Sequence, residues 1–407
     1  MAKEATRKKI VNALEKIIEF SLYGLILFIP ISKGAIEFFA TLAILSFIVK
    51  KILKPDFLFV RDKAHLFLFL FVIFSALSLF NSGVYFRKSF NALFFKWWEY
   101  ILIFLIIEDT LVTPAKIKRA IGIFLTVAVV VGIDAFFQKF TGFEFLRFKQ
   151  AGSVKDGVFA LTGPFNHYNS FSGYLISVLP LAIALFLEET RKVILRIGLF
   201  LLIVLLLGAL LFTFSRGGWI GFLVAGLLIA VLLPQKKASL AILSLFVLSL
   251  VLFPDVRERA IFIFQRGGDA SRFEIWRNAW IMIKENPFFG KGIGTYMDYL
   301  SKYSPSLGAQ YAHNSFLQIW AEAGIFSLFS FLCFVFMFLW QGIKKFKKTH
   351  NCLLAGLLGS ILGFLTHSFF DNHFYSLQLA MLFWVLFGLL SVCSKCKNGV
   401  ASSERLC

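Results

Sequence analysis

A histidine and a regular polar pattern interrupt the apolar stretch YAHNSFLQIWAEAGIF, residues 311–326. Asn314, Gln318 and Glu322 recur at intervals of four residues, so they share one face of a helix. His313 stands at the start of this helix, and its neutral imidazole can take a proton from a hydroxyl group. His313 is therefore a candidate general base. A histidine in this position also serves as a helix cap or a hydrogen-bonding group, and that alternative stays open.

Two arginines have the chemistry of phosphate ligands. Arg216, in FSRGGW, lies in a turn of a few residues where Gly217 and Gly218 permit a close backbone approach. Arg272 falls in the first turn of an amphipathic helix, which the capping-box start and tryptophan-bearing face of SRFEIWRNAWIMIKENP, residues 271–287, predict. Guanidinium groups bind phosphate through paired hydrogen bonds, and a helix start favours anions. The alternatives are that Arg216 snorkels to the membrane surface and that Arg272 pairs with a carboxylate.

Two further polar clusters are expected at the same end of the helices. Asn166, His167 and Asn169 lie in LTGPFNHYNSFSGY, where a long apolar run begins. Their side chains suit sugar hydroxyl groups, and they suit equally well a role in joining helices. Asp371 and His373, in HSFFDNHF, are each expected either to orient His313 or to bind substrate, and for Asp371 a plain interfacial carboxylate is the alternative.

The elements that position these residues are predicted to be membrane-spanning helices. The chain has 407 residues, of which 58% are hydrophobic and 16% charged, and its mean hydropathy is +0.79. Apolar runs of about 20 residues recur throughout it, which is the length of a helix that crosses a bilayer and far exceeds a barrel strand. The fold class is therefore all-α and polytopic, with one transmembrane domain over residues 1–407. The twelve predicted spans are 17–31, 34–50, 64–80, 90–108, 119–138, 167–187, 195–214, 217–234, 238–254, 314–340, 352–370 and 374–393, and for the short first two a re-entrant pair is the alternative.

The basic residues of the connecting segments predict the orientation. The segments that lie on the same side of the membrane as the N-terminus are those after every second span. Together with the two termini, they hold 25 of the 42 Lys and Arg residues. Because cytoplasmic loops are enriched in Lys and Arg, this side is predicted to be cytoplasmic. The same bias accounts for most of the net charge of +19, so no nucleic acid partner is expected.

One long loop, residues 255–313 between spans nine and ten, is predicted on the opposite, periplasmic side with amphipathic helices inserted in it. It carries eight basic and six acidic residues. An anionic ligand would explain the excess positive charge, and so would the freedom of long translocated loops from the charge rule. The glycines of GKGIGTY resemble a dinucleotide-binding fingerprint, but they follow a helix rather than a strand, so that interpretation is rejected.

These features are expected to meet in one cavity that opens away from the cytoplasm. The polar face with Asn314 and Gln318 should point into the bundle, because polar groups that face lipid are costly. His313, Arg216 and Arg272 would then lie together, with the LTGPFNHYNSFSGY cluster beside them. A base next to two arginines suits a reaction in which a hydroxyl group attacks and a diphosphate departs.

At these residues the chain resembles the superfamily of O-antigen ligases and O-antigen polymerases. The motifs that carry the resemblance are FSRGGW, SRFEIWRNAWIMIKENPFFGKGIGTY and HNSFLQIWAEAGIFS, and it extends over about residues 160–390. The ligase branch typically shows His, then Asn, Ser or Gln, then nine residues and Gly, with Gly, Thr or Tyr three positions further on. Here His313 and Asn314 are followed by Gly324, and Ser327 stands in the last place.

The resemblance implies a glycosyltransferase. Such ligases transfer O-antigen or a related glycan from undecaprenyl diphosphate to a sugar hydroxyl of the lipid A core, with inversion and without metal or nucleotide. They work at the periplasmic face of the bacterial inner membrane, among membrane lipids. Carried over, His313 would activate the acceptor hydroxyl. Arg216 and Arg272 would bind the diphosphate, and Arg277, about one turn later, is the substitute for Arg272.

Other functions share much of this pattern. An O-antigen polymerase or a protein O-oligosaccharyltransferase would use the same donor with a different acceptor. A flippase for lipid-linked glycans is the alternative from a different class, although transporters tend to place ionisable groups near the membrane midplane. Here the nearest such residues are Lys96 and Asp134. No cofactor is expected, and the oligomeric state is not predicted.

Overall fold

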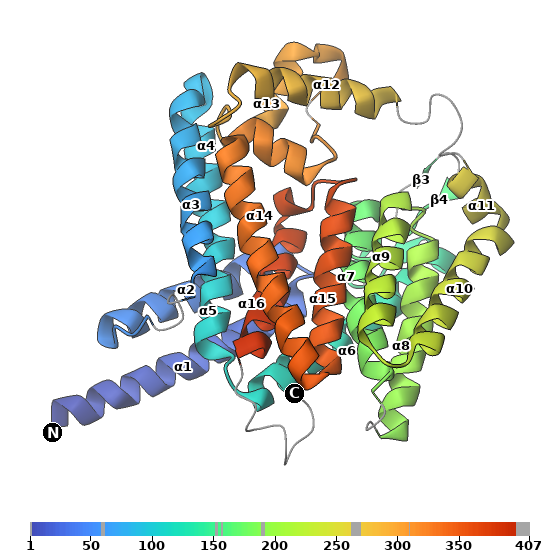
Figure 1. Cartoon of the computed structure of the whole chain (residues 1–407), viewed down its shortest axis with the longest axis horizontal. Helices are drawn as coiled ribbons and strands as arrows, with labels where there is room; N and C mark the ends of the chain where they lie inside the picture. Colours follow the sequence, from blue (N-terminus) through green and yellow to red (C-terminus); the bar gives the residue numbers. More distant parts are fainter. Residues whose placement is uncertain are drawn as a thin grey trace.

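The computed structural model describes residues 2–57, 62–150, 154–155, 158–188, 192–261, 270–308 and 310–395. Figure 1 shows a bundle of upright helices with smaller elements at its ends. The longer helices are α1 (Ala2–Phe28), α2 (Lys33–Leu53), α3 (Ala64–Leu77), α5 (Trp98–Thr110), α6 (Pro114–Thr141), α7 (Tyr168–Phe186), α8 (Val193–Leu211), α9 (Arg216–Leu232), α10 (Lys236–Leu252), α12 (Ala270–Glu285), α14 (Ser315–Thr349), α15 (Cys352–Ser368) and α16 (Leu377–Lys395). The short elements are η2 (Ser78–Asn81), η3 (Gly83–Tyr85), α4 (Phe86–Ala92), the π-helical η4 (Leu93–Trp97), α11 (Pro254–Ile261), α13 (Tyr296–Tyr303), η6 (Pro305–Leu307), η7 (His373–Tyr375) and the hairpin strands β1 (Phe143–Glu144), β2 (Lys149–Gln150), β3 (Val154–Lys155) and β4 (Val158–Phe159).

Each of the twelve predicted spans coincides with a helix or with a consecutive run of helices. Within the described ranges, seven such segments are long and apolar enough to cross a membrane. An eighth is added if α10 and α11, which meet at 93°, form one broken span. The apolar helices α9 and α15 are shorter, with 17 residues each. The prediction of an all-α, multi-pass membrane protein is therefore confirmed, whereas the number of twelve spans stays a prediction.

The helices α1 and α2 lie differently from the other predicted spans. Figure 1 shows both running across the lower end of the bundle rather than along it. They pack against each other and against α5 and α6. Neither is among the segments whose length and composition suit a membrane crossing, and α2 carries charge at both ends through Lys33, Glu37, Lys50 and Lys51. The pair therefore forms a unit at one end of the bundle.

Ion pairs hold this lower end together, and Lys50, Lys51 and Glu108 among their members are buried. Lys50 and Lys51 donate to the two oxygens of Asp109 over 2.8 and 2.6 Å. Lys395, at the end of α16, donates to Glu108 over 2.6 Å. Each pairing offsets the cost of removing a charge from water. The end of α2, the end of α5 and the end of α16 are thereby joined at one end of the molecule.

The opposite end carries α12 and α13 (Figure 1), and a bend in α14 receives the loop between them. The bend is at Gly324, whose φ of 83° is not helical. A Cβ atom there would collide with the carbonyl group of Phe288. The amide of Ile325 donates instead to the carbonyl of Pro287 over 3.0 Å. Gly324, the glycine of the predicted ligase pattern, is thus required by close contact between two distant segments.

The glycines of GKGIGTY have a structural reason as well. Gly290, Gly292 and Gly294 all have positive φ angles, of 67°, 101° and 80°. The amide of Gly292 donates to the carbonyl of Glu322 over 2.8 Å, and a Cβ atom on Gly290 would strike the same carbonyl. The glycines let this loop lie directly against α14, which is a role that needs no nucleotide.

Replacing Gly324 with alanine is expected to lower the free energy of unfolding by about 1–3 kcal/mol. The new Cβ atom would clash with Phe288, and alanine is strained at a positive φ angle. Thermal unfolding in detergent should show a clearly lower Tm. Gly198→Ala in α8 is the matched control, since an added Cβ atom there meets no neighbour, and its Tm should stay equal or rise slightly. Equal Tm values for the two variants would refute this account of the bend.

Candidate functional site

His313 stands in a strained turn directly before α14. Its φ is 48°, a left-handed conformation that residues other than glycine seldom adopt. Its Nδ1 atom lies 3.2 Å from Oδ1 of Asp371, and its side chain is 29% exposed. A strained, partly exposed imidazole that a carboxylate orients on one side keeps its other ring nitrogen available for proton transfer.

The polar face of α14 fastens this turn in place. The amide of Asn314 donates to Oδ1 of Asn372 over 3.0 Å, while its own side chain caps the start of α14. The side chain of Gln318 accepts from the amide of Ala312 over 3.1 Å and from Asn372. Gln318 and Glu322 are buried, which confirms that this face points into the bundle. Asn314 and Gln318 are thus occupied in holding the chain on both sides of His313.

Arg216 is the first residue of α9, beside the segment that leads to Asp371. Ser215 caps the helix, donates to Oδ1 of Asn169 over 2.8 Å and lies 3.3 Å from Nε2 of His367. Gly217 follows Arg216, and a Cβ atom on it would come within 2.8 Å of His367 and Phe370. This helix start therefore packs tightly against the end of α15. The two glycines of FSRGGW therefore serve close packing, as their sequence suggested.

Arg272 lies in the first turn of α12, and α12 is joined to the turn of His313. The indole of Trp276, one turn after Arg272, donates to the carbonyl of Ala312 over 2.9 Å. Arg272 is half-buried. Arg277 is exposed instead. The predicted capping box begins at Ser271, whose side chain lies outside the described residues.

Two of the three predicted residues thus lie at one segment, residues 367–373, at the end of α15 and beyond it. His313 bonds to Asp371 within it, and the helix start that carries Arg216 packs on it. The helix of Arg272 is joined instead to the turn of His313, through Trp276. This segment is the common support of the candidate site.

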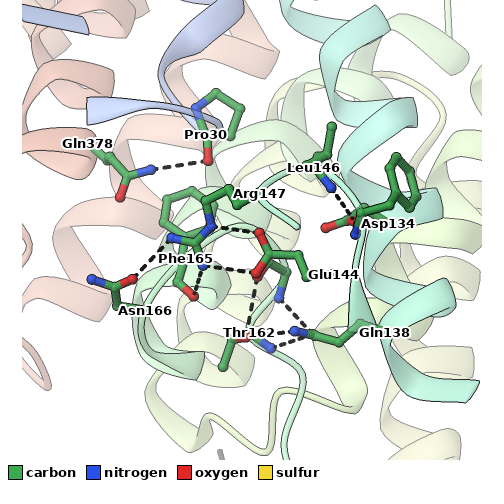
Figure 2. Close-up of polar contacts among 12 residues, drawn as sticks. Pro30, Asp134, Gln138, Glu144, Leu146, Arg147, Thr162, Phe165, Asn166 and Gln378 are labelled. Atoms are coloured by element: carbon green, nitrogen blue, oxygen red, sulfur yellow. Dashed lines mark hydrogen bonds and ion pairs between the residues drawn. The ribbon is translucent and has the colours of Figure 1, made fainter. Parts of the chain in front are cut away.

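The LTGPFNHYNSFSGY cluster, at the start of α7, is held by the hairpin of β1 and β2. Asn169 is buried, whereas Asn166 and His167 are exposed, and His167 caps α7 by accepting from the amide of Asn169 over 3.2 Å. Figure 2 shows Arg147 between Glu144 and Asn166, with its guanidinium donating to Asn166 over 3.0 Å. The cluster therefore joins helices through Asn169 and leaves Asn166 and His167 at the surface.

Sequence reasoning missed Arg147 and the buried histidine His367. Arg147 lies in the connection between spans five and six, on the side opposite the basic segments, and a cation there was the available signal. His367 was visible as the residue four positions before Asp371. Asp134, one of the two ionisable residues nearest the midplane, accepts from two backbone amides of the hairpin and so has a structural role (Figure 2).

Residues 200–332 match the sequence profile of a family described as O-Antigen ligase. An O-antigen ligase of Salmonella typhimurium is 30% identical over 159 residues, which is 34% of this chain and 39% of that protein. These matches support membership of the O-antigen ligase superfamily. An uncharacterized protein of Haemophilus influenzae is 28% identical over 118 residues, which is 25% of this chain and 29% of that protein. The chain thus matches well under half of the length of these relatives, and the resemblance predicted from the motifs is confirmed over the matched stretch.

The O-antigen ligase match includes Arg216, Arg272 and His313, and Asp371 lies beyond it. Although burial alone would raise the pKa of Asp371, its bond with His313 and the charge of nearby imidazoles hold the pKa well below its usual range. Asp371 is therefore ionised at neutral pH, which lets it hold His313 in one orientation. In the described ranges no group of three His, Cys, Asp or Glu residues is placed to hold a metal ion.

The second buried histidine, His373, makes stability depend on pH. The centroids of its ring and of the His367 ring lie 4.3 Å apart. Burial lowers the pKa of His373 to about 4, although the Asp371 carboxylate offsets part of this effect. In the unfolded chain its pKa is about 6.5. Between these values the unfolded state binds a proton that the folded state does not, so stability falls as the pH drops, by up to about 3 kcal/mol.

The variant His373→Gln should therefore show a shallower loss of Tm between pH 7 and pH 4.5 than the parent protein. Thermal unfolding at several pH values measures this slope. The control is His350→Gln, at an exposed histidine after α14, which should follow the parent. Parallel curves for parent and His373→Gln would show that this imidazole does not carry the pH dependence.

Proposed function

We propose that this protein is a glycosyltransferase that moves O-antigen or a related glycan from undecaprenyl diphosphate to a sugar hydroxyl of the lipid A core. The observation that carries the proposal is the bond between His313 and Asp371, on the segment against which the helix start of Arg216 packs. The match to O-antigen ligases, which includes His313 and Arg216, supports the same function.

The proposed reaction is an in-line displacement. Asp371 holds His313, whose free ring nitrogen takes the proton from the acceptor hydroxyl. The hydroxyl oxygen then forms a bond with the anomeric carbon of the glycan, and the bond from that carbon to the diphosphate breaks with inversion. The electron pair stays on the departing diphosphate, whose charge Arg216 and Arg272 neutralise. No metal or nucleotide takes part in this proposal.

The proposed orientation places the site at the periplasmic face of the bacterial inner membrane. The segments rich in Lys and Arg include Lys50 and Lys395, which lie at the end of the bundle opposite α12 and α13. Because such segments stay in the cytoplasm, this arrangement supports a periplasmic position for His313 and the loop 255–313. A lipid-linked donor would then reach the site from the membrane.

The alternatives differ in the acceptor or in the class. A polymerase would use a second lipid-linked glycan, and a protein O-oligosaccharyltransferase would use a protein hydroxyl, with the same chemistry at His313. A flippase is less well supported, because Asp134, an ionisable residue within a long helix, is engaged by backbone amides of a hairpin.

His313→Ala is expected to lower glycan transfer at least about 100-fold, which is the usual range for a general base. The assay combines the purified protein in proteoliposomes with undecaprenyl-diphosphate-linked O-antigen and lipid A core. His350→Ala, at an exposed histidine, is the control and should transfer like the parent. Full transfer by His313→Ala would show that His313 is not the general base. A parent protein that elongates the donor glycan but never modifies lipid A core would be a polymerase.

Arg216→Glu is expected to abolish transfer and binding of undecaprenyl diphosphate, since a carboxylate repels the leaving group. Arg216→Lys should keep a small part of the activity, because an ammonium group supplies charge without the paired hydrogen bonds. Turnover and the thermal shift caused by added undecaprenyl diphosphate measure both effects. Lys118→Glu, an exposed cation at the start of α6, is the charge-matched control. Unimpaired turnover in Arg216→Glu would refute the phosphate role.

A further inference from the structure

A cavity adjoins the candidate site and takes no part in the proposed reaction. It has a volume of about 620 Å³ and lies between the segment from η3 to α5 on one side and α13 and α14 on the other. Tyr311 and Tyr375 line it, and these residues flank the turn of His313 and the segment of Asp371. Neither Arg216 nor Arg272 lines it. The cavity therefore shares a wall with the site but is separate from the proposed diphosphate ligands.

The walls of this cavity are cationic. Arg87, Lys88 and Lys96 line it, and Lys88 forms an ion pair with Asp298 over 2.6 Å. Arg87 and Lys96 are exposed, and in the part of the chain that the structure describes neither has an ion pair. Two positive charges thus remain available to a ligand.

The carboxylate of Glu322, the one acidic group among the described lining residues, is fully engaged. It accepts from the amides of Gly294 and Tyr296 over 2.7 and 2.9 Å. It also accepts from the hydroxyl of Tyr375 over 2.8 Å and the amide of Gln318 over 3.0 Å. These four donors occupy the carboxylate oxygens of Glu322, and in the described part of the chain Glu322 forms no ion pair with Arg87 or Lys96.

Lys96 lies in the π-helical turn η4, inside the apolar segment that continues into α5. π-Helical turns are rare and occur often at functional sites. A lysine in a membrane-spanning segment is costly unless it is paired or faces an aqueous cavity. The neighbouring Trp97 is held by ring contacts with Phe71 and Tyr375, at 5.3 and 6.0 Å between centroids, so the turn has a defined orientation. An anionic ligand would compensate the charge of Lys96.

The remaining lining suits a sugar. The aromatic side chains of Tyr85, Trp97, Tyr100, Tyr311 and Tyr375 line the cavity, and all of them except Trp97 carry a hydroxyl group, of which that of Tyr375 is bonded to Glu322. Such groups pack against the apolar face of a sugar ring and hydrogen-bond to its edge. Aromatic walls with two unpaired cations therefore fit a saccharide that carries phosphate.

We infer that this cavity binds the phosphate-bearing saccharide of the acceptor glycolipid, with Arg87 and Lys96 as its anion ligands. The inference rests on the proposed function, and it assigns donor and acceptor to different sides of the His313 turn. The acceptor is held by the cavity next to Tyr311, and the diphosphate by Arg216 and Arg272. The hydroxyl to be glycosylated then reaches His313 from the acceptor side.

The test is the double variant Arg87→Gln/Lys96→Gln, assayed with phosphorylated lipid A core and with the same glycolipid after phosphatase treatment. The KM for the phosphorylated acceptor should rise at least about 10-fold, while kcat and the KM for the undecaprenyl-diphosphate donor stay unchanged. With the dephosphorylated acceptor, parent and variant should behave alike. Lys284→Gln, an exposed lysine of α12 outside the cavity, should match the parent. An unchanged acceptor KM, or a rise in the donor KM instead, would overturn the inference.

A binding experiment separates this inference from the proposed function, because it needs no turnover. Phosphorylated lipid A core should bind the parent protein in nanodiscs at least about 10-fold more tightly than the double variant. Inorganic phosphate at the same concentration should not displace it, and displacement would assign the cavity to a free anion. If the parent transfers no glycan but binds the glycolipid in this charge-dependent way, the proposed function fails and the cavity assignment stands. Equal binding by parent and variant overturns the assignment even if transfer occurs.

Discussion

The end of the molecule that carries α12 and α13 depends on one buried carboxylate. Glu322 has no exposed surface, and a charge removed from water in this way is very costly unless hydrogen bonds replace its hydration. Its donors come from three separate parts of the chain: the loop that leads into α13, the helix α14 itself and the turn before α16. The loss of this group would leave several donors unpaired at once, so the loop, the helix and the turn keep one relative position.

The hydrogen bonds of Glu322 also determine the geometry of the candidate site. Gln318 links Glu322 to Asn372 and to the backbone before His313, and Asn372 in turn holds the amide of Asn314. His313 therefore sits in a strained conformation that its surroundings impose, facing a carboxylate that its own environment keeps ionised. The polar stripe of α14 does not itself have to touch substrate to matter, because it positions the residue that is proposed to do so.

The cations of the protein have two different environments. At the lower end Lys50, Lys51 and Lys395 are paired with carboxylates, so their charges stabilise the fold and are not available to ligands. Near α13, by contrast, Arg87 and Lys96 line a cavity whose single described carboxylate is already engaged. This difference fits the position of Lys96 in an apolar segment, since an unpaired cation next to hydrocarbon is tolerated only where water or a ligand reaches it.

Hydropathy alone located the helices of the twelve predicted spans, because a bilayer requires long apolar runs with internally bonded backbones. Motif residues were equally visible in the sequence: His313, Arg216 and Arg272, and the glycines that the bend and the loop require. Only the tertiary structure decided that α1 and α2 lie across the bundle, that Arg272 is half-buried while Arg277 is exposed, and that Gln318 binds backbone instead of solvent. It also brought the π-helical turn of Lys96 to a cavity shared with residues more than two hundred positions later. Apolar burial has no direction of its own, so the packing of distant segments selects the neighbours of each side chain, and no local pattern in the sequence records that choice.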